Sequence, residues 1–210
     1  MAQEESPSVT LAESTIEVDA GETSTVTAEY QFDVESAGTG DEALSSIGGT
    51  MWKLSDREVG DITATIDGES VDPTVSEESG HHDVSVPVEG VSDGDTVTVT
   101  LEYDVSGPTG ELQTPLWVPE YSTPGQANVV DITATLPEGT TLSDDSFPTA
   151  ETVDGNTVEF DLLHVPGFVK MGYGQTAAGG LTTDTLYSLV GVVLIVGFIV
   201  GGLAIDRKTA

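Results

Sequence analysis

Apolar and polar residues alternate along most of the chain, in short runs separated by turn residues. The clearest run is 96–105, in which every second residue is apolar, and 23–34 shows the same period. A period of two places successive side chains on opposite faces of a β-strand. Asp67-Gly68 is a dipeptide typical of hairpin turns. No segment outside 186–205 shows a helical period, so the sequence predicts an all-β ectodomain of one or two immunoglobulin-like antiparallel β-sandwich units.

A break at 106–110, Ser-Gly-Pro-Thr-Gly, divides the β pattern in two. The pentapeptide Asp-Ile-Thr-Ala-Thr occurs at 61–65 and again at 131–135, which indicates either two related units or chance recurrence in a chain rich in Thr and Val. The second part is marginally stable by itself without disulfides, so we expect it to pack on the first. The predicted organisation is a frayed N-terminus (1–8), β-sandwich unit 1 (9–106), a linker (107–112), β-sandwich unit 2 (113–173), a Gly-rich stalk (174–185), a transmembrane helix (186–205) and a cytoplasmic tail (206–210).

The segment 186–205 is apolar and contains no charged residue. Twenty helical residues span about 30 Å, which matches the hydrocarbon core of a bilayer. Arg207 and Lys208 follow it directly, so the positive-inside rule places the C-terminus in the cytoplasm and the large N-terminal part outside. This type I topology requires a signal peptide removed before Met1, and the alternative is a tail-anchored protein with the opposite orientation.

Two glycines inside this segment, Gly197 and Gly201, have the spacing that allows two membrane helices to approach closely. They predict helix packing against a second copy or a protein partner. The simpler interpretation is that glycine is common in membrane spans.

The formal charge of −32 comes from 37 acidic and 5 basic residues, and it lies wholly before residue 184. Such a charge repels nucleic acid, so no nucleic-acid partner is expected. The acidic residues are spread between apolar strand patterns rather than collected in a tail, and molar salt screens their mutual repulsion. An evenly acidic, lysine-poor chain with a single apolar anchor resembles the cell-surface proteins of halophilic archaea.

Candidate chemistry is sparse along the chain. There are no cysteines, and no nucleophile elbow or phosphate-binding glycine loop is present. His81 and His82 are adjacent, so on a strand they point to opposite faces and do not share a metal ion easily; we interpret both as exposed loop residues. The sequence therefore predicts no enzyme activity, no cofactor and no metal.

The aromatic and proline-rich stretch 114–125 is the most distinctive one in the β region. Trp117 and Tyr121 within it, Phe168 further on, and Trp52 on an apolar island between polar loops are candidates for contacting a partner. The alternative is that the first three pack between the two β units and that Trp52 plugs the core.

A second resemblance concerns the order of elements. A long strand containing Tyr103, an aromatic-proline segment and a strand followed by Leu-Pro-Glu-Gly at 136–139 are similar to the β-sandwich N-terminal lobe of M1 aminopeptidases. The resemblance implies fold alone, because the zinc motif His-Glu-x-x-His of the peptidase lobe is absent.

Together these features predict a non-catalytic, membrane-anchored surface protein of a halophile that acts in protein–protein interaction, adhesion, or envelope or virion structure. Its expected partners are the lipid bilayer and an unidentified protein. The alternative is an accessory single-pass subunit of a larger membrane complex, such as a transporter, translocon or respiratory enzyme.

Overall fold

The computed structural model describes residues 6–40, 43–121, 129–143 and 145–175, and these residues form three β-sheets. The largest sheet has nine strands. In spatial order it contains β14 (Thr152–Asp154), β15 (Thr157–Leu162), β12 (Val130–Thr135), β1 (Ser8–Asp19), β2 (Thr23–Ser36), β9 (Thr96–Ser106), β5 (Thr63–Ile66) and β6 (Glu69–Val71), and β4 (Glu58–Val59) also pairs with β9.

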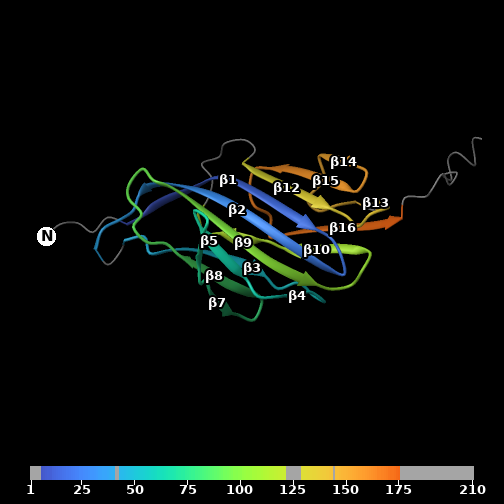
Figure 1. Cartoon of the computed structure of the whole chain (residues 1–210), viewed down its shortest axis with the longest axis horizontal. Coiled ribbons are helices and arrows are strands. Elements are labelled where there is room, and N and C mark those ends of the chain that lie inside the picture. The colour runs from blue at the N-terminus through green and yellow to red at the C-terminus, as the bar shows by residue number, and fades with distance from the viewer. Residues whose placement is uncertain (1–5, 41–42, 122–128, 144, 176–210) are drawn as a thin grey trace, which may run out of the picture. The chain divides into compact units, whose positions relative to one another are not determined.

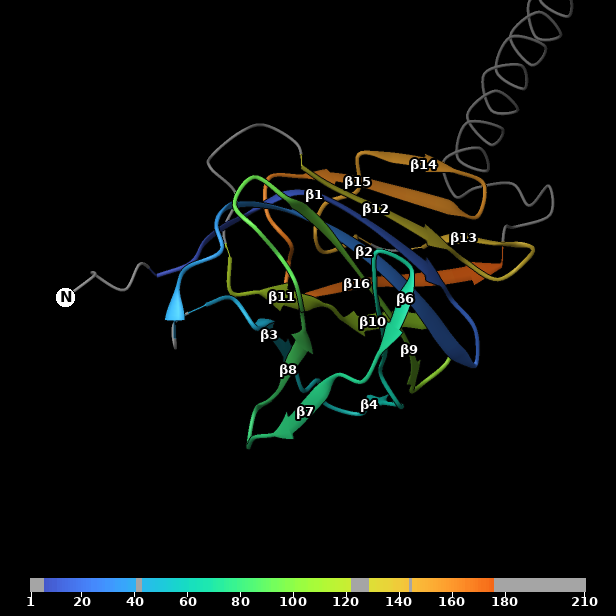
Figure 2. The same cartoon turned by 60° about the vertical axis from the view of Figure 1, so that its left-hand side comes forward.

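The two smaller sheets continue each other. One contains β11 (Trp117–Pro119), β3 (Ser46–Trp52), β8 (His81–Pro87) and β7 (Thr74–Glu77), and the other contains β10 (Glu111–Pro115), β16 (Phe168–Gln175) and β13 (Thr140–Leu142). Only Leu116 separates β10 from β11, and its N–H donates to the Gly167 carbonyl at 3.1 Å. The two sheets thereby form a second layer beside the nine-stranded sheet (Figures 1 and 2).

The core lies between these layers and follows the period of two. The inward positions are apolar from Val26 to Val34 in β2 and from Val97 to Val105 in β9, and they are buried together with inward residues of the second layer. Ser24, at the start of β2, is the polar exception. Two tyrosine hydroxyls connect the layers: Tyr30 donates to the Trp117 carbonyl at 2.9 Å, and Tyr103 donates to the Pro115 carbonyl at 2.8 Å. The prediction of an all-β sandwich is therefore confirmed at this level.

The predicted linker at 107–112 does not separate two units. A single compact unit extends to Gln175, and the strands that follow the linker, β12, β15 and β14, extend the sheet begun by β1 and β2. The linker itself is held in place, because the Arg57 guanidinium donates to the carbonyls of Pro108 and Glu111, both at 3.1 Å. The late strands complete the first sheet, which buries the apolar face that a separate second unit would leave exposed.

One pairing departs from the expected antiparallel arrangement. β1 and β12 run parallel, with Ile16 opposite Ile132. Parallel neighbours need a long crossover. Here the chain leaves the first sheet after β9, forms β10 and β11 in the second layer, and then returns as β12.

The Asp67-Gly68 turn is confirmed. It connects β5 and β6, which pair antiparallel, and both turn residues have positive φ angles, 50° and 84°. Two consecutive residues in this region are the requirement of a type I′ hairpin turn.

The membrane predictions concern a part of the chain outside the described residues. Within those residues, no helix is long and apolar enough to cross a membrane. The predicted span at 186–205 and its pair Gly197 and Gly201 lie beyond them. The predicted stalk overlaps the fold by two residues, because β16 continues to Gln175.

Candidate interaction site

Trp117 is fully buried, so the prediction that it contacts a partner is wrong for the folded chain. Its indole N–H donates to the Val84 carbonyl at 3.2 Å, and its ring meets Tyr30 edge-on with centroids 5.0 Å apart. Gly49 leaves room for the indole, because a Cβ there would collide with it. Trp117 thus takes the packing role, within one core rather than between two units.

Tyr121 is partly packed and partly exposed, so it fits neither predicted role, partner contact or packing, completely. Its ring meets Phe32 edge-on at a centroid distance of 6.4 Å, and it is half-buried. Burial, with the Glu120 carboxylate beside it, raises the pKa of the Tyr121 hydroxyl above its usual value. Together with Leu11 and Val165 it lines a small hollow of about 150 Å³. One side of Tyr121 is therefore committed to packing.

Trp52 and Phe168, in contrast, come together at the surface. Met51 points into the core, so Trp52 points outward from the end of β3, and it is 49% exposed. Its pyrrole edge lies against Gly167, where a Cβ would stand 2.8 Å from the indole Cδ1. Phe168 follows Gly167 on the outward face of β16. The sequence places these two aromatic residues more than a hundred positions apart.

Two further rings complete this surface. Phe147 is 53% exposed and lies 5.0 Å, centroid to centroid, from Phe168. His81 on β8 meets Trp52 edge-on at 5.8 Å. We call the surface formed by His81, Trp52, Phe168 and Phe147 the aromatic strip.

Sequence analysis did not identify His81 and Phe147 as contact candidates, and the structure shows why. His81 belongs to β8, not to a loop, because it pairs with Trp52 across the strand. Phe147 lies in a polar segment without strand periodicity and joins β16 through an isolated bridge to Lys170. An aromatic residue between serine and proline in an otherwise polar segment is the one signal that could have drawn attention to Phe147.

Each end of the strip carries a pair of side chains with opposite charge character. Lys170 Nζ lies 2.8 Å from Glu111 Oε1, next to Phe147. His81 Nε2 lies 3.2 Å from Asp83 Oδ1, next to Trp52. The strip thus has a full ion pair at its Phe147 end and a carboxylate–imidazole contact at its Trp52 end.

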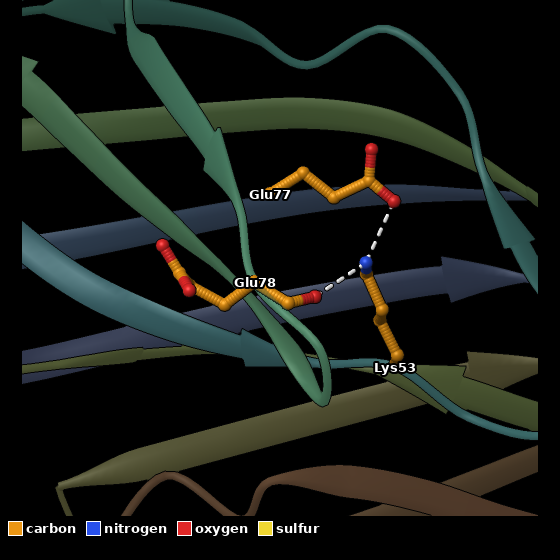
Figure 3. Close-up of polar contacts among 3 residues, drawn as sticks. All are labelled: Lys53, Glu77 and Glu78. Atoms are coloured by element: carbon orange, nitrogen blue, oxygen red, sulfur yellow. Dashed lines mark hydrogen bonds and ion pairs between the residues drawn. The ribbon is translucent and has the colours of Figure 1, made fainter.

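A second cluster of polar residues lies near the same strand ends (Figure 3). Lys53 Nζ donates to Glu77 Oε1 at 2.7 Å and to the Glu78 carbonyl at 2.6 Å. Lys53 and Glu77, with Arg57 and His82, border a hollow of about 470 Å³. His82 also belongs to β8 rather than to a loop, and as the strand neighbour of His81 it lies on the opposite face. No group of three or more His, Asp or Glu suited to a metal ion occurs among the described residues.

This Lys53 cluster predicts an acid-sensitive hairpin between β7 and β8. The hydrogen bond from Lys53 lowers the pKa of Glu77, and burial lowers the pKa of His82. Groups with a lowered folded-state pKa stabilise the fold above their ordinary pKa, and this contribution is lost as pH falls. The protection of β7 amides against hydrogen exchange should therefore decrease as pH drops below about 6.5, and again where Glu77 becomes protonated. Unchanged protection of β7 relative to β2, after correction for intrinsic exchange, would contradict the expectation.

Comparison with known proteins gives a fold-level result. No protein-family model and no curated protein matches the chain. The structure of yeast LTA4 hydrolase in complex with bestatin aligns with a TM-score of 0.50 and 10% identity, over 82% of this chain and 30% of that one. An M1 zinc metallopeptidase from Deinococcus radiodurans (0.46, 13%, 78% and 42%) and a putative nutrient binding protein from Legionella pneumophila (0.47, 8%, 80% and 67%) also align.

At 10% identity, the match to the yeast hydrolase shows the fold alone. It agrees with the β-sandwich architecture derived above. The chain spans only about 30% of the length of that hydrolase, and its sequence lacks the His-Glu-x-x-His motif.

Proposed function

We propose that the chain is a non-catalytic, membrane-anchored surface protein of a halophile that acts in protein–protein interaction, adhesion, or envelope or virion structure, and that it makes these contacts through the aromatic strip. The observation that carries the proposal is the exposure of Trp52 and Phe147, each about half accessible, on one face of the second layer. Exposed aromatic residues that cluster are characteristic of contact surfaces.

The two outer faces of the fold support this assignment by their contrast. The outward positions of β1, β2, β9 and β12 are occupied by carboxylates, threonines and other polar residues, and carry no aromatic residue. A partner would have to dehydrate these carboxylates to dock there, which is costly. The aromatic strip exposes apolar area instead, with the Lys170–Glu111 ion pair at one end. Its attraction for a partner does not depend on long-range electrostatics, which molar salt screens.

The position of the strip also suits a surface role. Phe168 begins β16 and Gln175 ends it, so about 23 Å of extended strand separate them. If 186–205 crosses the membrane, the chain leaves the β unit toward that anchor at Gln175. The Phe168 end of the strip then lies about a strand length along β16 from this exit.

The test is native purification of the intact chain from its membrane in molar salt. We expect Trp52→Ala to abolish stoichiometric co-purification of the contacted component, because it removes the largest exposed ring. Val75→Ala is the matched control, since Val75 is 45% exposed but lies outside the strip. Loss of the component in both variants, or in neither, would contradict the assignment of the strip.

The accessory-subunit alternative is separated by the same experiment. If Gly197→Leu releases a multi-pass partner while Trp52→Ala does not, the membrane segment and not the strip makes the decisive contact. The immunoglobulin-like classification remains part of the proposal, and the antiparallel order β1-β2-β9 supports it.

A further inference from the structure

We infer that the aromatic strip is a carbohydrate-binding surface. This inference rests on the proposed function, because it names the chemical class that the strip contacts. It is carried by three features of the described residues: the size of the exposed rings, the way they are held, and the polar pairs at both ends of the strip.

The exposed aromatic area is small. Two half-exposed aromatic side chains with parts of Phe168 and His81 offer on the order of 250 Å². A standard protein–protein interface buries about 800 Å² on each partner, and the surrounding surface of this chain is acidic. One or two sugar rings need far less area, since each stacks its C–H face on a single aromatic ring.

The rings are also fixed before any ligand arrives. Trp52 is held by Gly167 on one edge and by His81 on another, and Phe147 rests on Phe168. Little side-chain entropy is then lost on stacking. The negative face of an aromatic ring attracts the weakly positive C–H groups of a pyranose, and this attraction persists in high salt because no net charge takes part.

The polar pairs provide what sugar hydroxyls require. Asp83 and Glu111 offer carboxylate acceptors, while Lys170 offers donors, and all lie at the ends of the strip. Hydrogen bonds to charged groups are stronger than neutral ones. Donors and acceptors placed on either side of stacked rings can orient a hydroxyl-rich ligand. An apolar protein segment would leave these donors and acceptors unused.

The experiment uses the two tryptophans of the full-length chain in detergent and molar NaCl. Trp117 is buried, so acrylamide should quench the emission of Trp52 selectively. The probes are cellohexaose, laminarihexaose and mannohexaose, with a proline-rich decapeptide as the protein-type probe. We expect at least one hexasaccharide to shift Trp52 emission to shorter wavelength and to reduce its quenching, while the peptide has no effect.

Variants make the result specific. Trp52→Ala should weaken the binding of that hexasaccharide at least tenfold by calorimetry, Trp52→Phe should retain most of it, and Val75→Ala should leave it unchanged. Undiminished binding of the hexasaccharide to a fully folded Trp52→Ala variant would overturn the inference. A chain that responds to none of the three hexasaccharides, or only to the peptide, would overturn it as well.

Failure here and failure of the proposed function can be told apart. If Trp52→Ala still releases a co-purified protein from the membrane while no hexasaccharide protects Trp52, the strip is a contact surface for protein, and only the carbohydrate inference is lost. If neither experiment responds to Trp52→Ala, the strip has no contact role.

Discussion

Replacing Trp117 with alanine should lower the free energy of unfolding by about 3–5 kcal/mol, the range found when large buried aromatic residues are truncated. Trp117 is fully buried, packs edge-on against Tyr30 and Phe32, and donates its indole N–H to the Val84 carbonyl. Its removal leaves a cavity between the layers and deletes the indole hydrogen bond to β8. Denaturant titration in molar NaCl, followed by circular dichroism, measures the loss.

Trp52→Ala is the matched control, because it deletes the same side chain at the surface. Trp52 is half-exposed, so its loss should cost only about 1–2 kcal/mol. Tyr30→Phe tests the connection between the layers separately, since it removes the 2.9 Å hydrogen bond to the Trp117 carbonyl while keeping the ring. Equal destabilisation by Trp117→Ala and Trp52→Ala would mean that the burial of Trp117 does not anchor the core.

The contrast between the two tryptophans shows what sequence could and could not reveal about the site. Both stand in short apolar segments flanked by polar residues, so local pattern gave them the same two possible roles. They differ in the face of the strand on which they lie. Met51 pairs with Trp117 and both point into the core, so Trp52, the next residue on the strand, points outward. Which face points inward depends on which strands pair, and pairing between residues more than sixty positions apart cannot be recognised from the local sequence.

The same restriction to local sequence determined which features of the fold could be predicted. Alternation and turn chemistry identified the long strands β2 and β9 and the Asp67-Gly68 hairpin, because both act within a few residues. They could not show that the second copy of Asp-Ile-Thr-Ala-Thr, in β12, would join β1 in the first sheet. The repeat left two related units and chance recurrence open, whereas the strands that contain it lie in one sheet, β5 beside β9 and β12 beside β1.

The structure also shows how so acidic a sheet can form. On the outward face of the nine-stranded sheet, carboxylates usually stand opposite threonines: Glu17 and Glu102 both face Thr27, and Asp104 faces Thr25. Some threonines bind their neighbours, as Thr25 Oγ1 donates to Asp104 Oδ1 at 2.9 Å. Like charges directly opposite each other destabilise a sheet, so this alternation lets many acidic residues share one face.

Thr27→Glu should break this alternation and raise the salt requirement of the fold. The variant places three carboxylates in one cross-strand row with Glu17 and Glu102, at Cβ separations of about 5 Å. The Debye length is about 10 Å at 0.1 M salt and 3 Å at 1 M, so the repulsion acts fully in dilute buffer and is largely screened at molar salt. We expect a loss of about 1–2 kcal/mol near 0.1 M NaCl, from two unfavourable pairs, and little loss at molar NaCl.

The measurement is the NaCl concentration at which half of the chain is folded. The natural chain should unfold as NaCl falls below roughly 1 M, because its net charge of −32 is then no longer screened. Thr27→Glu should move this midpoint to higher salt, while Thr27→Gln, with nearly the same shape and no charge, should leave it in place. An equal shift for both variants would assign the effect to packing rather than charge. A natural chain that is fully stable in dilute buffer would refute the halophilic origin itself, because the acidic face would then need no salt to fold.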